Sequence, residues 1–179
     1  MLKTIVVVTA VVLVLAVSAV LIIAATRPDG FRVQRSTSIK APPEKIFAVL
    51  DDFRRWPSWS PYEAKDPAMK RTLSGAATGK GAVYEWDGNS NVGKGRMEIL
   101  DSQPASRVVI KLDFLKPFEG HNTAEFTMVP DGDATGVTWA MYGPSPFVAK
   151  VMGVLFDMDK MIGKDFEVGL ANLKSLAEK

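Results

Sequence analysis

The amino-terminal apolar run constrains this chain more than any other feature of its sequence. Residues 5–25 contain no charged side chain, and only Thr9 and Ser18 are polar. As an α-helix this run is about 31 Å long, which is enough to cross a hydrocarbon core of about 30 Å. We therefore predict a single-pass membrane anchor over residues 1–27, followed by one domain over residues 28–179.

Other interpretations of this segment stay open. Lys3 forms a minimal positive start and residues 23–25 approximate a small-residue cleavage site, as in a cleaved signal peptide, although the run exceeds the usual length of about 7–15 residues. A soluble helix is the third alternative. Basic residues flank both ends, so the positive-inside rule favours neither orientation. The larger number of basic residues after the run would retain the domain in the cytoplasm, whereas a start-transfer segment would place it on the extracytoplasmic side. We predict the extracytoplasmic side.

The composition of the chain excludes several classes of site. The absence of cysteine excludes disulfides, thiolate zinc sites, iron–sulfur clusters and cysteine nucleophiles. The single histidine, His121, removes multi-histidine metal sites. Two Gly-Lys-Gly strings, at residues 79–81 and 93–95, match neither a P-loop nor a dinucleotide fingerprint. A net charge of +2 provides no field that favours nucleic acid. We predict no metal, no cofactor and no nucleic-acid partner.

Turn residues and hydrophobic periodicity divide residues 28–179 into short elements. Residues 31–39 alternate as a strand, Pro43 begins a short helix, and residues 53–59 form a brief helical turn closed by Pro57 and Pro61. Hairpin chemistry favours an antiparallel meander for the strands that follow. Six strands are predicted over residues 70–73, 82–87, 93–101, 106–114, 121–129 and 136–142.

The last part of the chain has a helical period. After Pro144 and Pro146, apolar side chains recur at steps of three and four residues to about Leu176, which predicts one long amphipathic helix. The order is therefore one strand, two short helices, six strands and a long helix. This order predicts an α+β domain whose main helix lies on one face of the sheet.

Five strings in this order and spacing are informative together: FRVQRS at residues 31–36, IKAPPEKIF at 39–47, DFRRWPSWSP at 52–61, TAEFT at 123–127 and TGVTW at 135–139. They resemble the SRPBCC, or START-like, superfamily, and specifically its polyketide cyclase/dehydrase branch. The resemblance covers about residues 31–179. It implies a helix-grip fold, in which a curved antiparallel seven-stranded sheet wraps around a long C-terminal helix and encloses a ligand cavity. Similar proteins include binding proteins, lipid carriers and aromatic cyclases, so the resemblance identifies no reaction.

Strand alternation predicts which side chains face that cavity. The apolar register is rich in aromatic side chains and methionine, which suits an apolar or aromatic ligand, although such a stripe also forms an ordinary core. Gly163, on the closing helix, would leave space for the ligand. The predicted ligand-binding residues are Trp56, Trp59, Tyr84, Trp86, Ile110, Leu112, Phe126, Trp139, Met141, Phe156, Asp159 and Gly163.

Several of these side chains have alternative roles. Trp56 and Trp59 either gate the cavity or seal the core. The Tyr84 hydroxyl either contacts the ligand or satisfies a buried carbonyl group. Asp159 either orients the ligand or forms a cap or ion pair. His121 alternates away from the apolar register, which argues against acid/base catalysis, and Glu98, Glu125 and Asp113 are expected to face solvent.

We therefore expect a membrane-anchored domain that binds a hydrophobic small molecule or lipid. One alternative is an enzyme of the aromatic cyclase or dehydratase type, for which the sequence shows no clear acid/base pair and no catalytic residue. Another is an envelope interaction or stress-response domain without a ligand. The sequence leaves open whether the protein is an enzyme and which protein partners it has.

Overall fold

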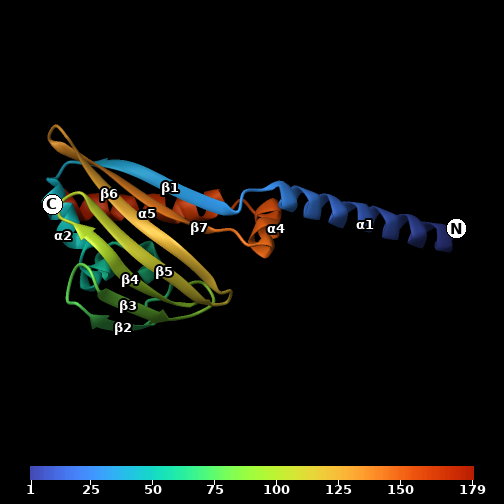
Figure 1. Cartoon of the computed structure of the whole chain (residues 1–179), viewed down its shortest axis with the longest axis horizontal. Helices are drawn as coiled ribbons and strands as arrows, with labels where there is room; N and C mark the ends of the chain where they lie inside the picture. Colours follow the sequence, from blue (N-terminus) through green and yellow to red (C-terminus); the bar gives the residue numbers. More distant parts are fainter. The chain divides into compact units, whose positions relative to one another are not determined.

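The computed structural model describes residues 1–179 and contains one antiparallel sheet of seven strands. The strands are β1 (Gly30–Ile39), β2 (Lys70–Gly75), β3 (Ala82–Asp87), β4 (Lys94–Gln103), β5 (Arg107–Lys116), β6 (Gly120–Asp131) and β7 (Ala134–Pro144). Their order in the sheet is β1-β7-β6-β5-β4-β3-β2. The sheet curves around helix α5 (Met158–Ala177), as Figure 1 shows. The predicted α+β helix-grip class is confirmed.

The alternation of apolar and polar residues correctly predicted where the strands lie in the sequence. Each of the seven predicted strands is present, and most extend a few residues beyond the predicted bounds because the hairpins are tight. The inward register is also confirmed for the central strands: Ile99, Ile110, Phe126 and Val137 are fully buried. The most deeply buried side chains of these central strands therefore lie on one face of the sheet, as the period of two requires.

The segment between β1 and β2 contains three short helices where two were predicted. Helix α2 (Pro43–Leu50) and the 3-10 helix η1 (Phe53–Ser58) match the prediction. Helix α3 (Pro61–Lys65) was missed. Pro61 was predicted to close the preceding turn, but it occupies the first turn of α3, where the missing N–H of proline costs no intrahelical hydrogen bond.

The prediction of one continuous closing helix is wrong. The segment forms two helices, α4 (Phe147–Leu155) and α5 (Met158–Ala177), separated at Phe156, whose backbone is extended with φ −130° and ψ 139°. The apolar period continues across this break, so periodicity alone does not reveal it. Phe156 and Asp159 therefore do not share one uninterrupted helix face.

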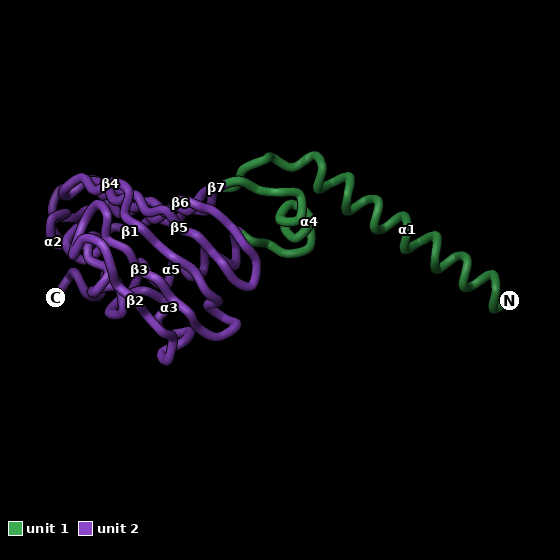
Figure 2. The backbone as a smooth tube through the Cα atoms, turned by 60° about the horizontal axis from the view of Figure 1, so that its bottom comes forward, with its two compact units in different colours: residues 1–31, 144–158 green, residues 32–143, 159–179 purple.

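The chain separates into two compact units, which are coloured green and purple in Figure 2. Unit 1 comprises Met1–Phe31 and Pro144–Met158, and unit 2 comprises Arg32–Gly143 and Asp159–Lys179. Unit 1 contains α4 and helix α1 (Leu2–Thr26), which includes the whole apolar run. With a mean hydropathy of 3.2 over its most apolar window, α1 is a candidate membrane span; a signal sequence near the N-terminus can meet the same criteria of length and composition.

Helix α5 and the sheet form the core of unit 2. Phe166, Leu170 and Leu173 of α5 are buried. The Phe166 ring stacks on Trp139 of β7, with 4.1 Å between ring centroids and 10° between ring planes. Gly169 permits this close packing, because a Cβ atom there would lie 2.7 Å from the Trp139 ring and 2.9 Å from Pro61.

Candidate functional site

The inward face of the sheet is sealed at one end and accessible at the other. Its side chains form cross-strand rows along the sheet. In order, these rows are Val108–Phe126–Trp139, Ile99–Ile110–Ala124–Met141 and Met97–Leu112–Asn122. Along β5, Ile110 is 0% exposed and Leu112 is 8% exposed, and Phe114 beyond them is half-buried. The inward face is therefore fully buried at the sealed end and slightly exposed at the accessible end, where β5 finishes and β6 begins.

Aromatic side chains line this accessible end. The Trp86 ring lies over Gly95 of the neighbouring strand, where any Cβ atom would collide with it. Trp86 also meets the Phe114 ring edge-on at 5.9 Å between centroids and donates a hydrogen bond from Nε1 to the Val92 carbonyl at 2.9 Å. With its polar edge satisfied, the Trp86 ring offers an apolar surface.

The sealed end is filled by a cluster of stacked and edge-on rings. Trp139 packs between Phe126 and Phe166, and Trp59 meets Trp139 at 5.5 Å between centroids. Trp56 packs edge-on against Trp59 and donates a hydrogen bond to the Leu50 carbonyl at 3.1 Å. Trp56 and Trp59 are buried in η1 and the loop after it, so in this structure they seal the core.

One polar atom in this cluster has no partner in the protein. The Nε1 atom of Trp59 is buried and makes no hydrogen bond. Buried indole N–H groups are ordinarily paired, since leaving one unpaired costs about 1–3 kcal/mol. Trp59 therefore presents an unused donor inside the domain.

The space predicted beside Gly163 is occupied. The guanidinium group of Arg35 lies directly against the Gly163 Cα, where a Cβ atom would overlap it. Arg35 donates hydrogen bonds to Asp159 Oδ2 at 3.0 Å and to Glu167 Oε1 at 2.8 Å. Gly163 therefore admits an arginine side chain and not a ligand. Asp159 has the ion-pair role that was its alternative, and the hydrogen bond from Arg35 lowers the pKa of the Asp159 carboxyl group.

Phe156 belongs to a different compact unit from the other predicted residues. It belongs to unit 1, between α4 and α5, and its side chain is exposed. The break in the closing helix explains this position, because the residues before Met158 no longer follow the α5 face that packs on the sheet.

Tyr84 belongs to a buried polar network that the sequence did not reveal. Its hydroxyl donates to Glu63 Oε1 at 2.7 Å, and Arg71 donates from Nε to Glu63 Oε2 at 2.6 Å. Burial and the hydrogen bond to Glu63 raise the pKa of Tyr84 well above its usual value. The partner of Tyr84 is therefore a carboxylate and not a backbone carbonyl group. A proline at the start of α3 followed by Glu63 in its first turn was the available signal, but it does not specify a contact with β3.

His121 faces away from the interior, as its strand parity predicted. It pairs across the strands with Asp113, and its Nδ1 atom lies 2.8 Å from Asp113 Oδ1. Asp113 was expected to face solvent, but it is buried beneath His121 and Lys111 on the outer face. Burial alone would raise the pKa of Asp113; the hydrogen bonds from His121 and Lys111 outweigh it and lower that pKa. Tyr84 and His121 lie on opposite faces of the sheet and form no acid/base pair.

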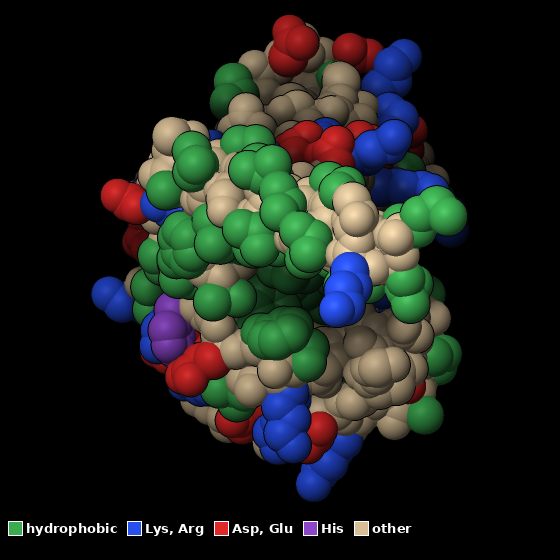
Figure 3. Space-filling view, turned by 90° about the vertical axis from the view of Figure 1, so that its right-hand side faces the viewer, with side chains coloured by type: hydrophobic (Ala, Val, Ile, Leu, Met, Phe, Trp, Pro, Cys, Tyr) green, Lys and Arg blue, Asp and Glu red, His purple; other side chains and the backbone are tan.

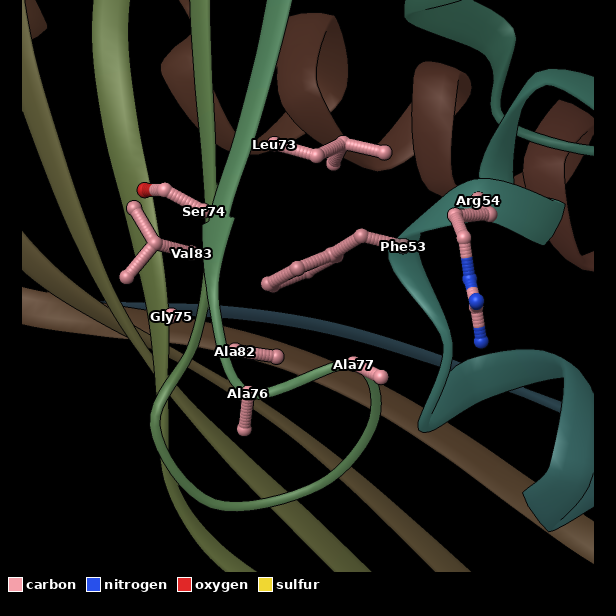
Figure 4. Close-up of a pocket in the computed structure, with 9 residues that line it drawn as sticks. All are labelled: Phe53, Arg54, Leu73, Ser74, Gly75, Ala76, Ala77, Ala82 and Val83. Carbon is pink, nitrogen blue, oxygen red and sulfur yellow. The ribbon is translucent and has the colours of Figure 1, made fainter.

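Two hollows lie beside η1. The first, of about 160 Å³, is lined by Phe53, Arg54, Leu73, Ser74, Gly75, Ala76, Ala77, Ala82 and Val83. Figure 4 shows Phe53 directed from η1 toward the β2–β3 hairpin, whereas Arg54 is directed away from it. The second, of about 640 Å³, is lined by Lys45, Val49, Arg54, Arg55, Pro57, Ser58, Leu176 and Ala177. Neither hollow includes a residue predicted to bind the ligand.

Comparison with known proteins gives one family and one fold. The sequence profile of a family described as "Polyketide cyclase / dehydrase and lipid transport" matches residues 30–178. None of the curated proteins matches the chain.

Several solved structures are similar to this chain. Protein CV1439 from Chromobacterium violaceum has 16% identity and a TM-score of 0.59 over 86% of this chain and 99% of that one. The Aha1 dimer from Colwellia psychrerythraea has 18% identity and a TM-score of 0.57 over 83% and 96%. The di-domain ARO/CYC StfQ from the steffimycin biosynthetic pathway has 12% identity and a TM-score of 0.63 over 83% and 51%. At these identities the likeness shows the fold alone.

Proposed function

The chain belongs to the polyketide cyclase/dehydrase and lipid transport family, and on that premise we propose that it binds a hydrophobic small molecule or lipid between the sheet and α5. Residues 28–179 are the binding domain in this proposal, and residues 1–27 anchor it in a membrane as a single-pass protein. The observation that carries the proposal is the small increase in exposure along the inward face, from Val108 at 0% to Leu112 at 8%.

The chemistry of the accessible end suits an apolar guest. Trp86, Leu112 and Met141 offer apolar surface that is almost but not completely buried. Methionine and aromatic side chains adapt to irregular apolar shapes, and small-molecule sites combine such a lining with a few polar groups. Asn122 lies opposite Leu112 in the inward register and supplies a polar group beside it.

The sealed end contributes a second polar group, the indole N–H of Trp59. The unpaired Trp59 Nε1–H is available to a carbonyl or hydroxyl oxygen that enters the aromatic cluster. Such an oxygen would satisfy a donor that the protein leaves unsatisfied, which favours an amphiphile over a pure hydrocarbon.

The anchor and the binding site support each other. Apolar molecules partition into bilayers, so a domain held at the membrane meets its ligand where that ligand is concentrated. Helix α1 supports this role because it is long enough to cross the hydrocarbon core and none of its most apolar window is buried in the protein. We place the domain on the extracytoplasmic side, which reporter fusions at the carboxyl terminus test: an active phosphatase reporter supports this side, and a reporter active only in the cytoplasm contradicts it.

The binding proposal is tested with leucine-to-tryptophan substitutions at three positions. Leu112→Trp fills the accessible end of the interior, Leu115→Trp adds the same bulk to an exposed position of the same strand, and Leu176→Trp fills the larger hollow. Full-length protein in detergent is incubated with a lipid extract, and bound molecules are measured by native mass spectrometry. We expect Leu112→Trp to abolish binding and the other two variants to retain it.

Two results would contradict the proposal. Binding lost only in Leu176→Trp would move the ligand to the larger hollow. No bound molecule in the parent protein would leave the domain without the proposed ligand. Thermal unfolding of each variant confirms that the fold is retained.

A further inference from the structure

Helix α4 is apolar on almost every side. Its nine residues, FVAKVMGVL, include one charged side chain, Lys150. Helices of soluble domains normally place polar residues on their outer face. In α4 none of the residues is buried. The helix therefore needs an environment other than water for its outer face.

The single charged side chain of α4 points toward the segment that follows the carboxyl-terminal end of α1. Lys150 is 10% exposed, and its ammonium group pairs with Asp29, two residues beyond the first charge after α1. The backbone N–H of Ser145 donates to the Asp29 carbonyl at 2.6 Å. A Cβ atom on Gly153 would lie 3.1 Å from the Arg27 guanidinium group. Unit 1 thus places the middle of α4 beside the carboxyl-terminal end of the candidate span.

The opposite side of α4 is exposed and apolar. Its side chains are Val148, Met152 and Leu155. Exposed apolar side chains also lie at the start of the helix, at Phe147, and beyond its end, at Phe156 and Met158. Val148 is 70% exposed and Leu155 is 58% exposed. Contiguous apolar surface of this kind marks a protein or membrane contact. Figure 3 shows hydrophobic side chains gathered on one face of the molecule, with charged side chains around them.

We infer that α4 is a second membrane contact, which lies in the boundary between lipid headgroups and acyl chains. This inference rests on the proposed anchoring by α1. At about 1.5 Å per residue, nine residues are too short to cross a bilayer, but an apolar helix of this length can lie in the interface plane. Arg27 is the first charge after the apolar run, so it marks the headgroup boundary, and α4 lies at the level of Arg27.

Lipid fits this surface better than a protein partner does. The exposed α4 side chains continue the apolar surface of α1, whose side chains are exposed along the helix. A surface that adjoins a membrane span at its boundary residue is exposed to lipid wherever the span is inserted. Insertion of Val148, Met152 and Leu155 would also hold unit 1 to the membrane at two places instead of one.

The chain has no cysteine, so each introduced cysteine is a unique labelling site. We would label three valine-to-cysteine variants with an environment-sensitive NBD fluorophore: Val17→Cys in α1, Val148→Cys in α4 and Val129→Cys at the exposed end of β6. All three valines are more than half exposed in the protein. The full chain is reconstituted in phosphatidylcholine–phosphatidylglycerol nanodiscs with spin-labelled lipids that quench at shallow or deep positions.

We expect blue-shifted emission at positions 17 and 148. Deep spin labels should quench the fluorophore at position 17, and shallow spin labels should quench it at position 148. Position 129 should show neither the blue shift nor quenching. If position 17 is quenched but position 148 behaves like position 129, the inference about α4 is overturned while the anchor stands. If neither position 17 nor 148 is quenched, the anchor and the inference both fail. If position 148 is shielded but not quenched by lipid, a protein covers α4 and the lipid assignment is wrong. Leu155→Cys repeats the measurement about two turns further along the same face of α4.

Discussion

Replacing Tyr84 by phenylalanine tests how much the buried network contributes to stability. The substitution removes only the hydroxyl that donates to Glu63 at 2.7 Å. Tyr84 is buried, so water has little access to the released Glu63 oxygen. Hydrogen bonds to charged groups contribute about 1.5–3 kcal/mol, so we expect the free energy of unfolding to fall by about 2 kcal/mol. For a domain of about 150 residues this corresponds to a decrease in Tm of about 4–8 °C.

The sheet contains a matched control for this variant. Tyr142 donates to Glu125 Oε2 at 2.9 Å, and Arg107 also contacts Glu125, so the same three residue types meet at a partly exposed position. In Tyr142→Phe water can replace the hydroxyl, so we expect a loss below about 1 kcal/mol. Both variants are measured by urea and thermal unfolding of the full chain in detergent, followed by tryptophan fluorescence.

The pH dependence adds a second readout for Tyr84. Because its pKa is raised in the folded protein, the contribution of Tyr84 to stability is complete below its unfolded pKa of about 10 and decreases as the pH rises above that value. The difference between the parent and Tyr84→Phe should therefore narrow above about pH 10. Equal losses in Tyr84→Phe and Tyr142→Phe, or a difference that does not change with pH, would refute the argument that burial strengthens this network.

Two further predictions concern packing and acid stability. Gly169→Ala should destabilise the protein by about 1 kcal/mol or more, because the rigid rings of Trp139 and Pro61 must move; Gly163→Ala should cost less, because the Arg35 guanidinium can swing into water. Equal unfolding energies for these two variants would contradict this. Burial alone would raise the pKa of the Glu125 carboxyl group, but hydrogen bonds from Arg107 and Tyr142 outweigh burial and lower that pKa below 4.5. The contribution of Glu125 to stability is therefore present above that pH and is lost on acidification. Glu125→Gln should therefore lower stability at pH 7 and flatten its decrease between about pH 5 and pH 3; an unchanged slope would show that Glu125 does not contribute.

Much of the fold could be predicted because its signals are local. Alternation in β4–β7 marks which side chains point inward, and Pro43 marks the start of α2. Two local signals were misleading. Pro61 can end one turn or begin the next helix, and the apolar period runs through Phe156 although the backbone there is extended. In both cases the same residues are compatible with two backbone paths, and long-range packing selects one.

The candidate site was less predictable because its decisive contacts join distant residues. Arg35 and Glu167 are 132 positions apart, and Tyr84 and Glu63 are 21 apart. No periodicity indicates that an arginine from β1 occupies the space beside Gly163, or that a glutamate of α3 meets a tyrosine of β3. The predicted inward tryptophans are present, but only the cross-strand rows show that Trp139 is sealed while Leu112 lies nearer the solvent.

The sequence by itself determined which side of each strand is apolar and that the first helix is apolar along its whole length. Both properties depend on neighbouring residues and on a regular backbone repeat. The tertiary structure alone decided where the closing helix breaks, which charge occupies the gap at Gly163, and that α4 directs Lys150 to Asp29 and its apolar side chains outward. These features depend on which distant side chains compete for the same space and the same hydrogen bonds, and that competition exists only once the chain has folded.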